Sequence, residues 1–241
     1  MTRFNISLAN LNIEMNCKYN FTREFCKDYI TDSTKADIVA TATDAEIIEE
    51  ITASNRVLAN DYVESICLYR SIAEQLPAFD CCVFHGAAIS YSGLAYLFVA
   101  PSGTGKTTHI KLWRKYLGDR VDIINGDKPI LHITDNGVTV YGTPYAGKEG
   151  WQKNTSFKLG GICIIKRGTS NRIDKLNAYK NLPYLIRQIY MPKSEINARR
   201  TLELTDKLCL NLPLYLLQCD ISQQAVKTAF EALTGEFYNI D

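Results

Sequence analysis

The fold expected for this chain follows from the stretch Ala100-Pro101-Ser102-Gly103-Thr104-Gly105-Lys106-Thr107-Thr108. The apolar run 94–99 before it is typical of a buried strand, and residues 109–117 after it are typical of a helix. Strand, glycine-containing loop, Lys-Thr and helix in this order predict a phosphate-binding loop of the Walker A kind. In such a loop backbone N–H groups and the positive end of the helix face phosphate oxygens. Residues 100–105 are named the glycine loop below.

The motif assigns a role to each of its residues. Lys106 would reach the β- and γ-phosphates, and the Thr107 hydroxyl would bind Mg²⁺, so the expected ligands are a nucleoside triphosphate, taken as ATP, and Mg²⁺. The strict motif begins with Gly where this chain has Ala100, a mild change because Ala is the next smallest residue. The alternative is a Gly-Thr-Gly turn before a surface helix. The residues expected around the phosphates are Pro101, Ser102, Gly103, Thr104, Gly105, Lys106, Thr107 and Thr108.

Composition excludes several classes of function. The chain has 241 residues, which fits one large domain or one domain with a small appendage. Its net charge is +1, so no broad basic surface suggests nucleic acid or a membrane as partner. The longest apolar run, 94–100, is too short to span a bilayer, and the first residues lack the apolar segment of a signal peptide.

The cysteines and histidines favour a reduced protein without zinc. None of the eight cysteines has C-x-x-C spacing, and most stand among Val, Ile and Leu, where a thiol behaves as a small buried hydrophobe. With only three histidines in the chain, a zinc site is not expected. A cytoplasmic location is the simplest interpretation.

Patterning predicts an N-terminal α+β appendage over residues 1–80 and a kinase domain over 81–241. In the appendage, period-two alternation predicts a hairpin, and apolar residues at helical spacing predict short helices. The segments expected in it are strands at 4–8, 11–15 and 36–42 and helices at 21–30, 44–51 and 62–76. In the domain they are strands at 81–89, 94–100, 121–124, 130–134, 138–141, 159–166 and 214–219, and helices at 109–117, 182–211 with a break near Pro192, and 222–233.

Two candidates for chemistry lie near the motif. Asp127 follows the apolar strand 121–124, where a carboxylate would bind the metal or accept a proton; the alternative is a turn former in Asn-Gly-Asp-Lys-Pro. His85 lies one strand before the motif, and the alternative is a satisfied core histidine.

Further candidates lie later in the chain. Lys148 and Glu149 stand in the glycine-rich loop 142–150, where Lys148 would contact substrate or phosphate and the alternative is a solvated turn. Arg187, Arg199 and Arg200 are candidates for an arginine that stabilises the transition state, against the alternative of solvated helical positions. Trp113 and Trp151 are expected in the core.

The order of these segments resembles a known family. Phe84-His85-Gly86-Ala87-Ala88-Ile89, a turn, an apolar strand, Pro101–Thr108, a helix, a second strand and Gly126-Asp127 resemble the catalytic core of HPr kinase/phosphorylase. They also resemble ATP-dependent phosphoenolpyruvate carboxykinase, which shares that nucleotide site. The resemblance covers residues 81–135. It implies an α/β fold with a P-loop kinase core, a mixed sheet and flanking helices.

The resemblance also implies roles for matching positions. Lys106 and Thr107 would hold phosphate and magnesium, and His85 would lie near the transferred phosphate. Asp127 would match the first Asp of the family's paired acidic motif, which binds metal or acts as base. The chain departs from the family at Lys128, where the second acid is expected, and the family's later acidic loop is not recognisable.

We therefore expect an ATP- and Mg²⁺-dependent kinase that phosphorylates a hydroxyl, such as a Ser of a protein or peptide or a small molecule. A true carboxykinase is disfavoured by length. An ATP-hydrolysing switch usually has an acidic pair after the second strand, whereas here Lys128 follows Asp127. A non-catalytic nucleotide-sensing protein is a further alternative. The acceptor stays open, as does assembly into a homo-oligomer.

Overall fold

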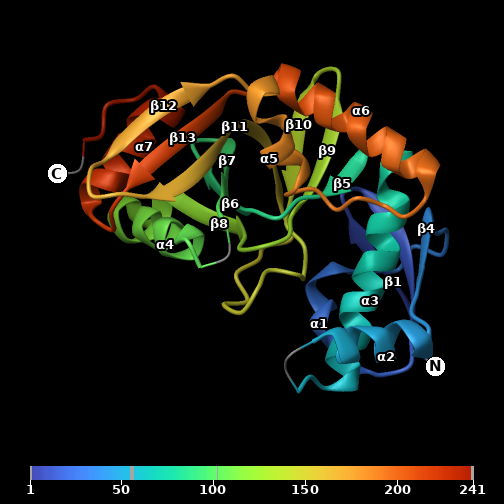
Figure 1. Cartoon of the computed structure of the whole chain (residues 1–241). Helices are drawn as coiled ribbons and strands as arrows, with labels where there is room; N and C mark the ends of the chain where they lie inside the picture. Colours follow the sequence, from blue (N-terminus) through green and yellow to red (C-terminus); the bar gives the residue numbers. More distant parts are fainter. Residues whose placement is uncertain (1, 55–56, 102, 240–241) are drawn as a thin grey trace. The chain divides into compact units, whose positions relative to one another are not determined.

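The computed structural model describes residues 2–54, 57–101 and 103–239 (Figure 1). The chain forms two compact units. The first comprises Met1–Phe79 with Met191–Thr201, and the second comprises Asp80–Tyr190 with Leu202–Asp241. Within the described residues, every helix is too short or too polar to cross a lipid bilayer.

The first unit contains a four-stranded sheet of order β3-β1-β2-β4. Alternate residues of its central hairpin are buried, which is the period-two pattern expected from the sequence. Helix α2 begins at Asp44, as expected, and its N-cap Thr43 forms a capping box with Glu46. The elements are β1 (Thr2–Leu8), β2 (Leu11–Cys17), α1 (Phe21–Phe25), β3 (Ile30–Thr31), β4 (Ile38–Thr41), α2 (Asp44–Ala53) and α3 (Asn60–Gln75).

The second unit is built on a mixed sheet of order β5-β9-β10-β11-β7-β6-β8, to which β13 is added beside β11 and β12 beside β13. The strands are β5 (Cys81–Val83), β6 (Ala87–Tyr91), β7 (Leu94–Val99), β8 (Val121–Asn125), β9 (Ile130–Thr134), β10 (Gly137–Tyr141), β11 (Ser156–Arg167), β12 (Arg172–Leu176) and β13 (Leu214–Cys219). The mixed sheet with flanking helices confirms the expected α/β class.

Strand direction determines where the loops of this unit meet. Strand β6 pairs antiparallel with both β7 and β8, so β7 and β8 run in the same direction. Strand β11 is parallel to β7, and β13 is parallel to β11. The carboxyl ends of these four strands and the amino end of β6 therefore lie on one side, named here the carboxyl end of the sheet.

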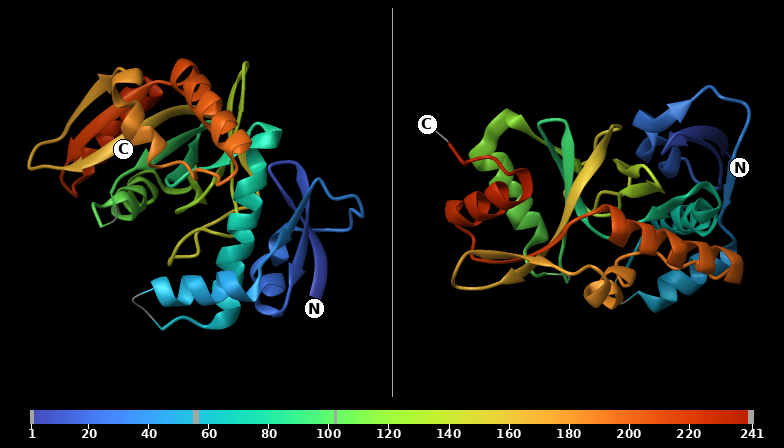
Figure 2. Two further views of the ribbon diagram at one scale, coloured as in Figure 1. Left: turned by 45° about the vertical axis from the view of Figure 1, so that its right-hand side comes forward. Right: turned by 90° about the horizontal axis from the view of Figure 1, so that it is seen from above.

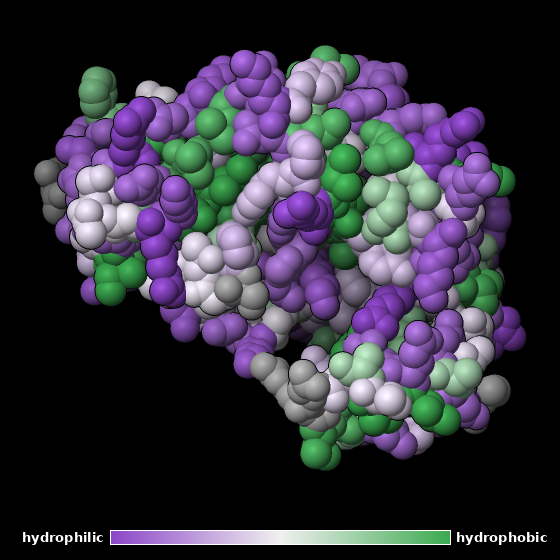
Figure 3. Space-filling model, viewed as in Figure 1, coloured by the Kyte–Doolittle hydropathy of each residue, from purple (hydrophilic) through white to green (hydrophobic). Residues whose placement is uncertain are grey.

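Two apolar layers cover the sheet. In β7, Leu97 and Val99 join the layer that includes α6 (Glu195–Asn211), whereas Tyr96 and Phe98 join the layer that includes α4 (Lys106–Leu117) and α7 (Gln223–Thr234). Figure 1 and the right-hand view of Figure 2 show α4 and α7 side by side on their face. On the other face, hydrophobic residues are visible between β13 and the short helix α5 (Leu182–Ile186) in Figure 3.

One expected strand is wrong. Residues 81–89 do not form a single strand, because the chain leaves the sheet at His85-Gly86 and re-enters it in another place. Strand β5 pairs with β9, whereas β6 pairs with β7 and β8. A Cβ on Gly86 would lie 3.1 Å from the Phe98 carbonyl oxygen, so a side chain at this crossing would fit only if its neighbours shifted by a few tenths of an ångström. The sequence also gave no signal for β12.

Trp113 is the largest side chain at the centre of the α4 layer. It is fully buried and contacts the rings of Tyr96, Phe98, His109 and Phe230. We expect Trp113→Ala to lower the free energy of unfolding by about 3–5 kcal/mol, because it removes a large buried ring and leaves a cavity. Denaturant titration measures the change.

The control for that variant is Leu210→Ala in α6, where the leucine is 72% exposed. We expect it to change the free energy of unfolding by less than about 0.5 kcal/mol. Equal losses in the two variants would contradict the assignment of Trp113 to the core.

Candidate functional site

Three segments distant in sequence meet at the carboxyl end of the sheet. The glycine loop follows β7, His85 precedes β6, and Asp127 follows β8. Because β6 lies between β7 and β8, the position before β6 is flanked by the loops that follow its two neighbours. The strand order therefore places His85 between the glycine loop and Asp127.

Asp127 is the centre of the site. Its Oδ1 lies 3.2 Å from His85 Nε2 and 3.4 Å from Lys106 Nζ. The side chain of Lys106 is 11% exposed and that of Asp127 is 27% exposed, so the ion pair is largely shielded from water. Both donors meet the same carboxylate oxygen, which fixes how the carboxylate is turned.

A buried asparagine shapes the turn that carries Asp127. Asn125 Oδ1 accepts hydrogen bonds from the backbone N–H groups of Asp127, at 2.9 Å, and Lys128, at 2.8 Å. Its Nδ2 donates to the carbonyl oxygen of Thr143, and the Thr143 hydroxyl donates to the carbonyl oxygen of Lys128. Both Asn125 and Thr143 are fully buried. The turn is therefore held by side-chain hydrogen bonds inside the protein.

Burial and neighbouring charges shift the pKa of both partners. Burial by itself raises the pKa of Asp127, but the hydrogen bond from His85 and the charges of Lys106 and Lys128 outweigh it, and the net pKa lies below 3.8. Burial lowers the pKa of Lys106, and Asp127 offsets part of that effect. Asp127 is therefore a carboxylate at neutral pH.

The glycine loop leads directly into the first turn of α4. Gly103 and Gly105 have φ values of 74° and 121°, which favour glycine, and a Cβ on either would meet nothing within 4 Å. Gly105 is the N-cap of α4 and supplies no side-chain hydrogen bond to the N–H groups of the first turn. These donors, with Lys106 as the first residue of the helix, fit a phosphate group.

Arg167, at the carboxyl end of β11, was not among the expected site residues. Its Nε donates to the Thr104 carbonyl oxygen at 2.9 Å, and its Nη2 donates to the carbonyl oxygen of Gly103. Arg167 therefore holds the glycine loop from the neighbouring strand. In the sequence, the one signal that could have pointed to Arg167 was its position at the end of an expected strand. That position became informative only when the order of the strands in the sheet was known.

The loop 142–155 packs against the Asp127 turn through its backbone. A Cβ on Gly147 would lie 3.2 Å from the Cβ of Asp127, and a Cβ on Gly126 would lie 2.6 Å from the Ala146 carbonyl oxygen. Lys148 is exposed, and the carboxylate of Glu149 lies 4.0 Å from Lys111 Nζ. Their expected contacts with substrate stay a prediction.

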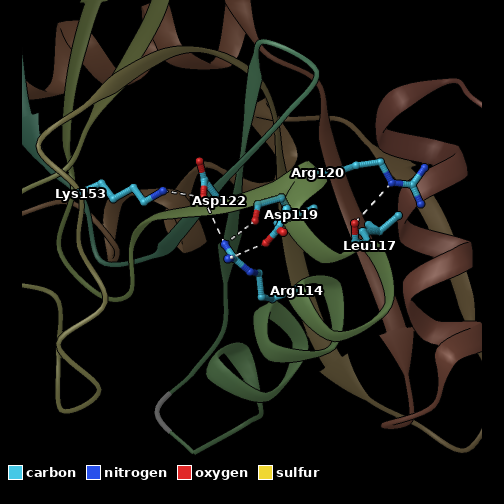
Figure 4. Close-up of polar contacts among 7 residues, drawn as sticks. Arg114, Leu117, Asp119, Arg120, Asp122 and Lys153 are labelled. Carbon is cyan, nitrogen blue, oxygen red and sulfur yellow. Dashed lines mark hydrogen bonds and ion pairs between the residues drawn. The ribbon is translucent and has the colours of Figure 1, made fainter.

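Ion pairs at the start of β8 connect it to α4 and to this loop (Figure 4). Arg114 donates to the Val121 carbonyl oxygen at 2.8 Å and to Asp122 at 3.2 Å, and Lys153 Nζ lies 2.6 Å from Asp122. Hydrogen bonds from Lys153 and Arg114 lower the pKa of Asp122. The network fixes the end of β8 opposite Asp127.

The remaining predicted residues are placed as follows. Thr107 lies in the first turn of α4, and Asp127 is not among its hydrogen-bond or ion-pair partners in the part of the chain that the structure describes. Ser102 lies outside the described residues. Arg187 is next to Gln188, whose carbonyl oxygen accepts the His85 N–H at 2.6 Å. Arg199 and Arg200 belong to the first unit. Trp113 is buried as expected, and Trp151 packs half-buried on the α4 layer.

The oxygen atoms near the glycine loop suit a hard cation. Thr107 and Asp127 offer a hydroxyl and a carboxylate, the donor types that Mg²⁺ prefers. Among the described residues, no group of three or more His, Cys, Asp or Glu side chains could hold a metal ion. Mg²⁺ commonly uses one or two protein ligands and takes the others from phosphate and water.

Comparison with solved structures gives a remote likeness. No family model matches the chain, and no curated protein matches it. Among solved structures, the Hpr(Ser) kinase/phosphatase from Coxiella burnetii is similar with a TM-score of 0.36 and 8% identity, over 64% of this chain and 93% of that one. At this TM-score the likeness carries no argument about function.

The Asn125 network gives a test of stability. We expect Asn125→Ala to lower the free energy of unfolding by about 1–3 kcal/mol, because it leaves buried backbone groups without partners. Asn136→Ala in the exposed turn after β9 is the control, with an expected change below about 0.5 kcal/mol. Similar denaturant midpoints for the two variants would contradict this role for Asn125.

The shifted pKa of Asp127 gives a test of pH dependence. Because the folded pKa is lower than the unfolded value of 3.8, the carboxylate adds stability above that pH, and the contribution is lost as the pH falls through the folded pKa. We expect wild type to exceed Asp127→Asn in stability at pH 7 and the difference to shrink below pH 4. Denaturant unfolding from pH 3 to pH 7 measures it, with the fully exposed Asp119, as Asp119→Asn, as control. A constant difference would contradict the shift.

Proposed function

We propose that this protein is an ATP- and Mg²⁺-dependent kinase that transfers the γ-phosphoryl group to a hydroxyl of a protein, peptide or small molecule. The observation that carries the proposal is the contact between Asp127 and the first residue of α4, Lys106, at 3.4 Å. It joins the expected phosphate-binding group to the expected proton acceptor at one end of one sheet.

Binding of the triphosphate would use the glycine loop as a P-loop. The N–H groups at the start of α4 and the Lys106 ammonium would neutralise phosphate charge. Thr107 and Asp127 would hold Mg²⁺, which supplies further charge neutralisation when bound. Arg167 supports the loop from outside, because its hydrogen bonds go to loop carbonyl oxygens.

Transfer would use Asp127 as the base. The acceptor hydroxyl forms a bond to the γ-phosphorus, its proton passes to Asp127, and the bond to the β-phosphate oxygen breaks to release the nucleoside diphosphate. The lowered pKa keeps Asp127 ionised at neutral pH, which is the form that can accept a proton. His85 would orient the carboxylate through Oδ1.

An ATP-hydrolysing switch is less well supported. Such proteins commonly follow the first acid with a second one that helps to polarise water, whereas Lys128 occupies that position here. Its positive charge also contributes to the low pKa of Asp127.

The proposal is tested with γ-labelled ATP, Mg²⁺ and candidate acceptors that bear Ser or small hydroxyl groups. We expect Lys106→Ala to lose nucleotide binding, because it removes the buried cation at the helix start. Asp127→Asn should keep nucleotide binding and lose transfer by about 10²–10⁴-fold, the range for a positioned base.

Matched controls separate these effects from general loss of charge. Lys115→Ala on the exposed side of α4 and Asp119→Asn should both retain activity. Label found only as free phosphate would favour hydrolysis, and full transfer by Asp127→Asn would overturn its assigned role.

A further inference from the structure

We propose that the nucleoside end of the triphosphate binds in a cavity over the carboxyl ends of β11 and β13, on the side of the glycine loop opposite Asp127. The cavity has a volume of about 260 Å³, and its walls include Thr104, Gly105, Leu112, Ile165, Asp220 and Ile221. This inference rests on the proposed function and adds the direction in which the substrate lies.

The strand order supports this direction. Strand β8, which precedes Asp127, lies two strands from β7 on one side, and β13, which precedes Asp220, lies two strands from β7 on the other. With neighbouring strands about 4.8 Å apart, each position is about 10 Å from the strand that carries the glycine loop. A triphosphate bound at the loop with its γ-phosphate toward Asp127 therefore extends its nucleoside toward Asp220.

The chemistry of the cavity fits a nucleoside better than a phosphate. Leu112, Ile165 and Ile221 provide apolar surface for a base. Asp220 provides a carboxylate whose Oδ1 is held by Ser222 and Asn171, and these hydrogen bonds lower its pKa. An ionised carboxylate repels phosphate and accepts hydrogen bonds from ribose hydroxyls.

His109, in the cavity wall, carries a buried donor without a partner among the described residues. His109 lines the cavity and is 3% exposed. Its Nε2 lies 3.0 Å from Trp113 Nε1, which is only a donor, so Nε2 is the acceptor and the proton of the neutral ring is on Nδ1. Among the described residues, Nδ1 has no hydrogen-bond partner. Because the Nδ1 atom is itself buried, a base in the cavity would reach this donor only after a side chain of the wall moves aside.

The hydrogen bond from Arg167 to the glycine loop shows how one loop peptide is turned. Arg167 lines the cavity and holds the Thr104 carbonyl oxygen toward itself. In a planar trans peptide the next N–H, that of Gly105, points the opposite way. The loop therefore directs a carbonyl group toward the cavity wall and an amide donor away from it, as expected if phosphate lies beyond the cavity.

The test compares the binding of two probes, ATP and inorganic tripolyphosphate. Each probe is titrated into the protein in the presence of Mg²⁺, and the heat of binding is measured by calorimetry. Leu112→Trp places a large ring in the cavity, and Tyr116→Trp, one turn further along α4 and outside the cavity lining, is the matched control. We expect Leu112→Trp to weaken ATP binding at least tenfold and to leave tripolyphosphate binding unchanged. The control should bind both probes as wild type does.

A second variant tests the ribose contact. Asp220→Asn should weaken ATP about tenfold and leave 2′,3′-dideoxy-ATP unaffected, because the latter lacks the hydroxyls that the carboxylate would bind. If Leu112→Trp fails to fold, as judged by its thermal midpoint, Ile221→Asp replaces it, since that side chain is 76% exposed.

The outcomes separate the two proposals. ATP binding at wild-type strength in the cavity variants overturns the nucleoside site and leaves the proposed kinase intact. If Lys106→Ala binds neither probe, and Leu112→Trp loses binding of ATP but keeps binding of tripolyphosphate, both proposals are supported. Failure of the wild-type protein to bind either probe overturns both.

Discussion

The antiparallel strand β6 between β7 and β8 is the constraint on which the arrangement of the second unit depends. It makes β7 and β8 point the same way, so their loops open on the same side of the sheet. The parallel pairs of β11 with β7 and β13 bring Arg167 and Asp220 to that side as well. Five strand termini thus supply a row of polar groups, whereas the strands themselves are buried between two apolar layers.

Within that arrangement, a few buried polar groups determine the local geometry. Asn125 and Thr143 lie in a largely apolar interior, where an unsatisfied polar atom is costly and a satisfied network is specific. Their hydrogen bonds hold the Asp127 turn in its observed conformation. The backbone of Ala146 also packs closely against Gly126 in the same turn. The position of the carboxylate is therefore set by the core beneath it.

Lys106 and Asp127 stabilise each other in the fold, and in the proposed kinase both would also bind the substrate. Lys106 is largely buried, which disfavours its charge, and Asp127 compensates by lying close to it. A phosphate at the helix start would offer Lys106 a second anionic partner, so in the proposed kinase the ion pair and the substrate compete for one cation. Groups poised between two such partners are typical of functional sites.

The sequence by itself determined the elements that depend on neighbouring residues. It predicted the strand, glycine loop and helix around Lys106, the hairpin of β9 and β10, and a strand ending before Asp127, because periodicity and turn residues are local signals. Tertiary structure alone decided the break at His85-Gly86, the support of the loop by Arg167, the addition of β12 and the cavity beside Asp220. These depend on which strands become neighbours, and strand pairing is a contact between residues far apart in the chain that no local pattern records.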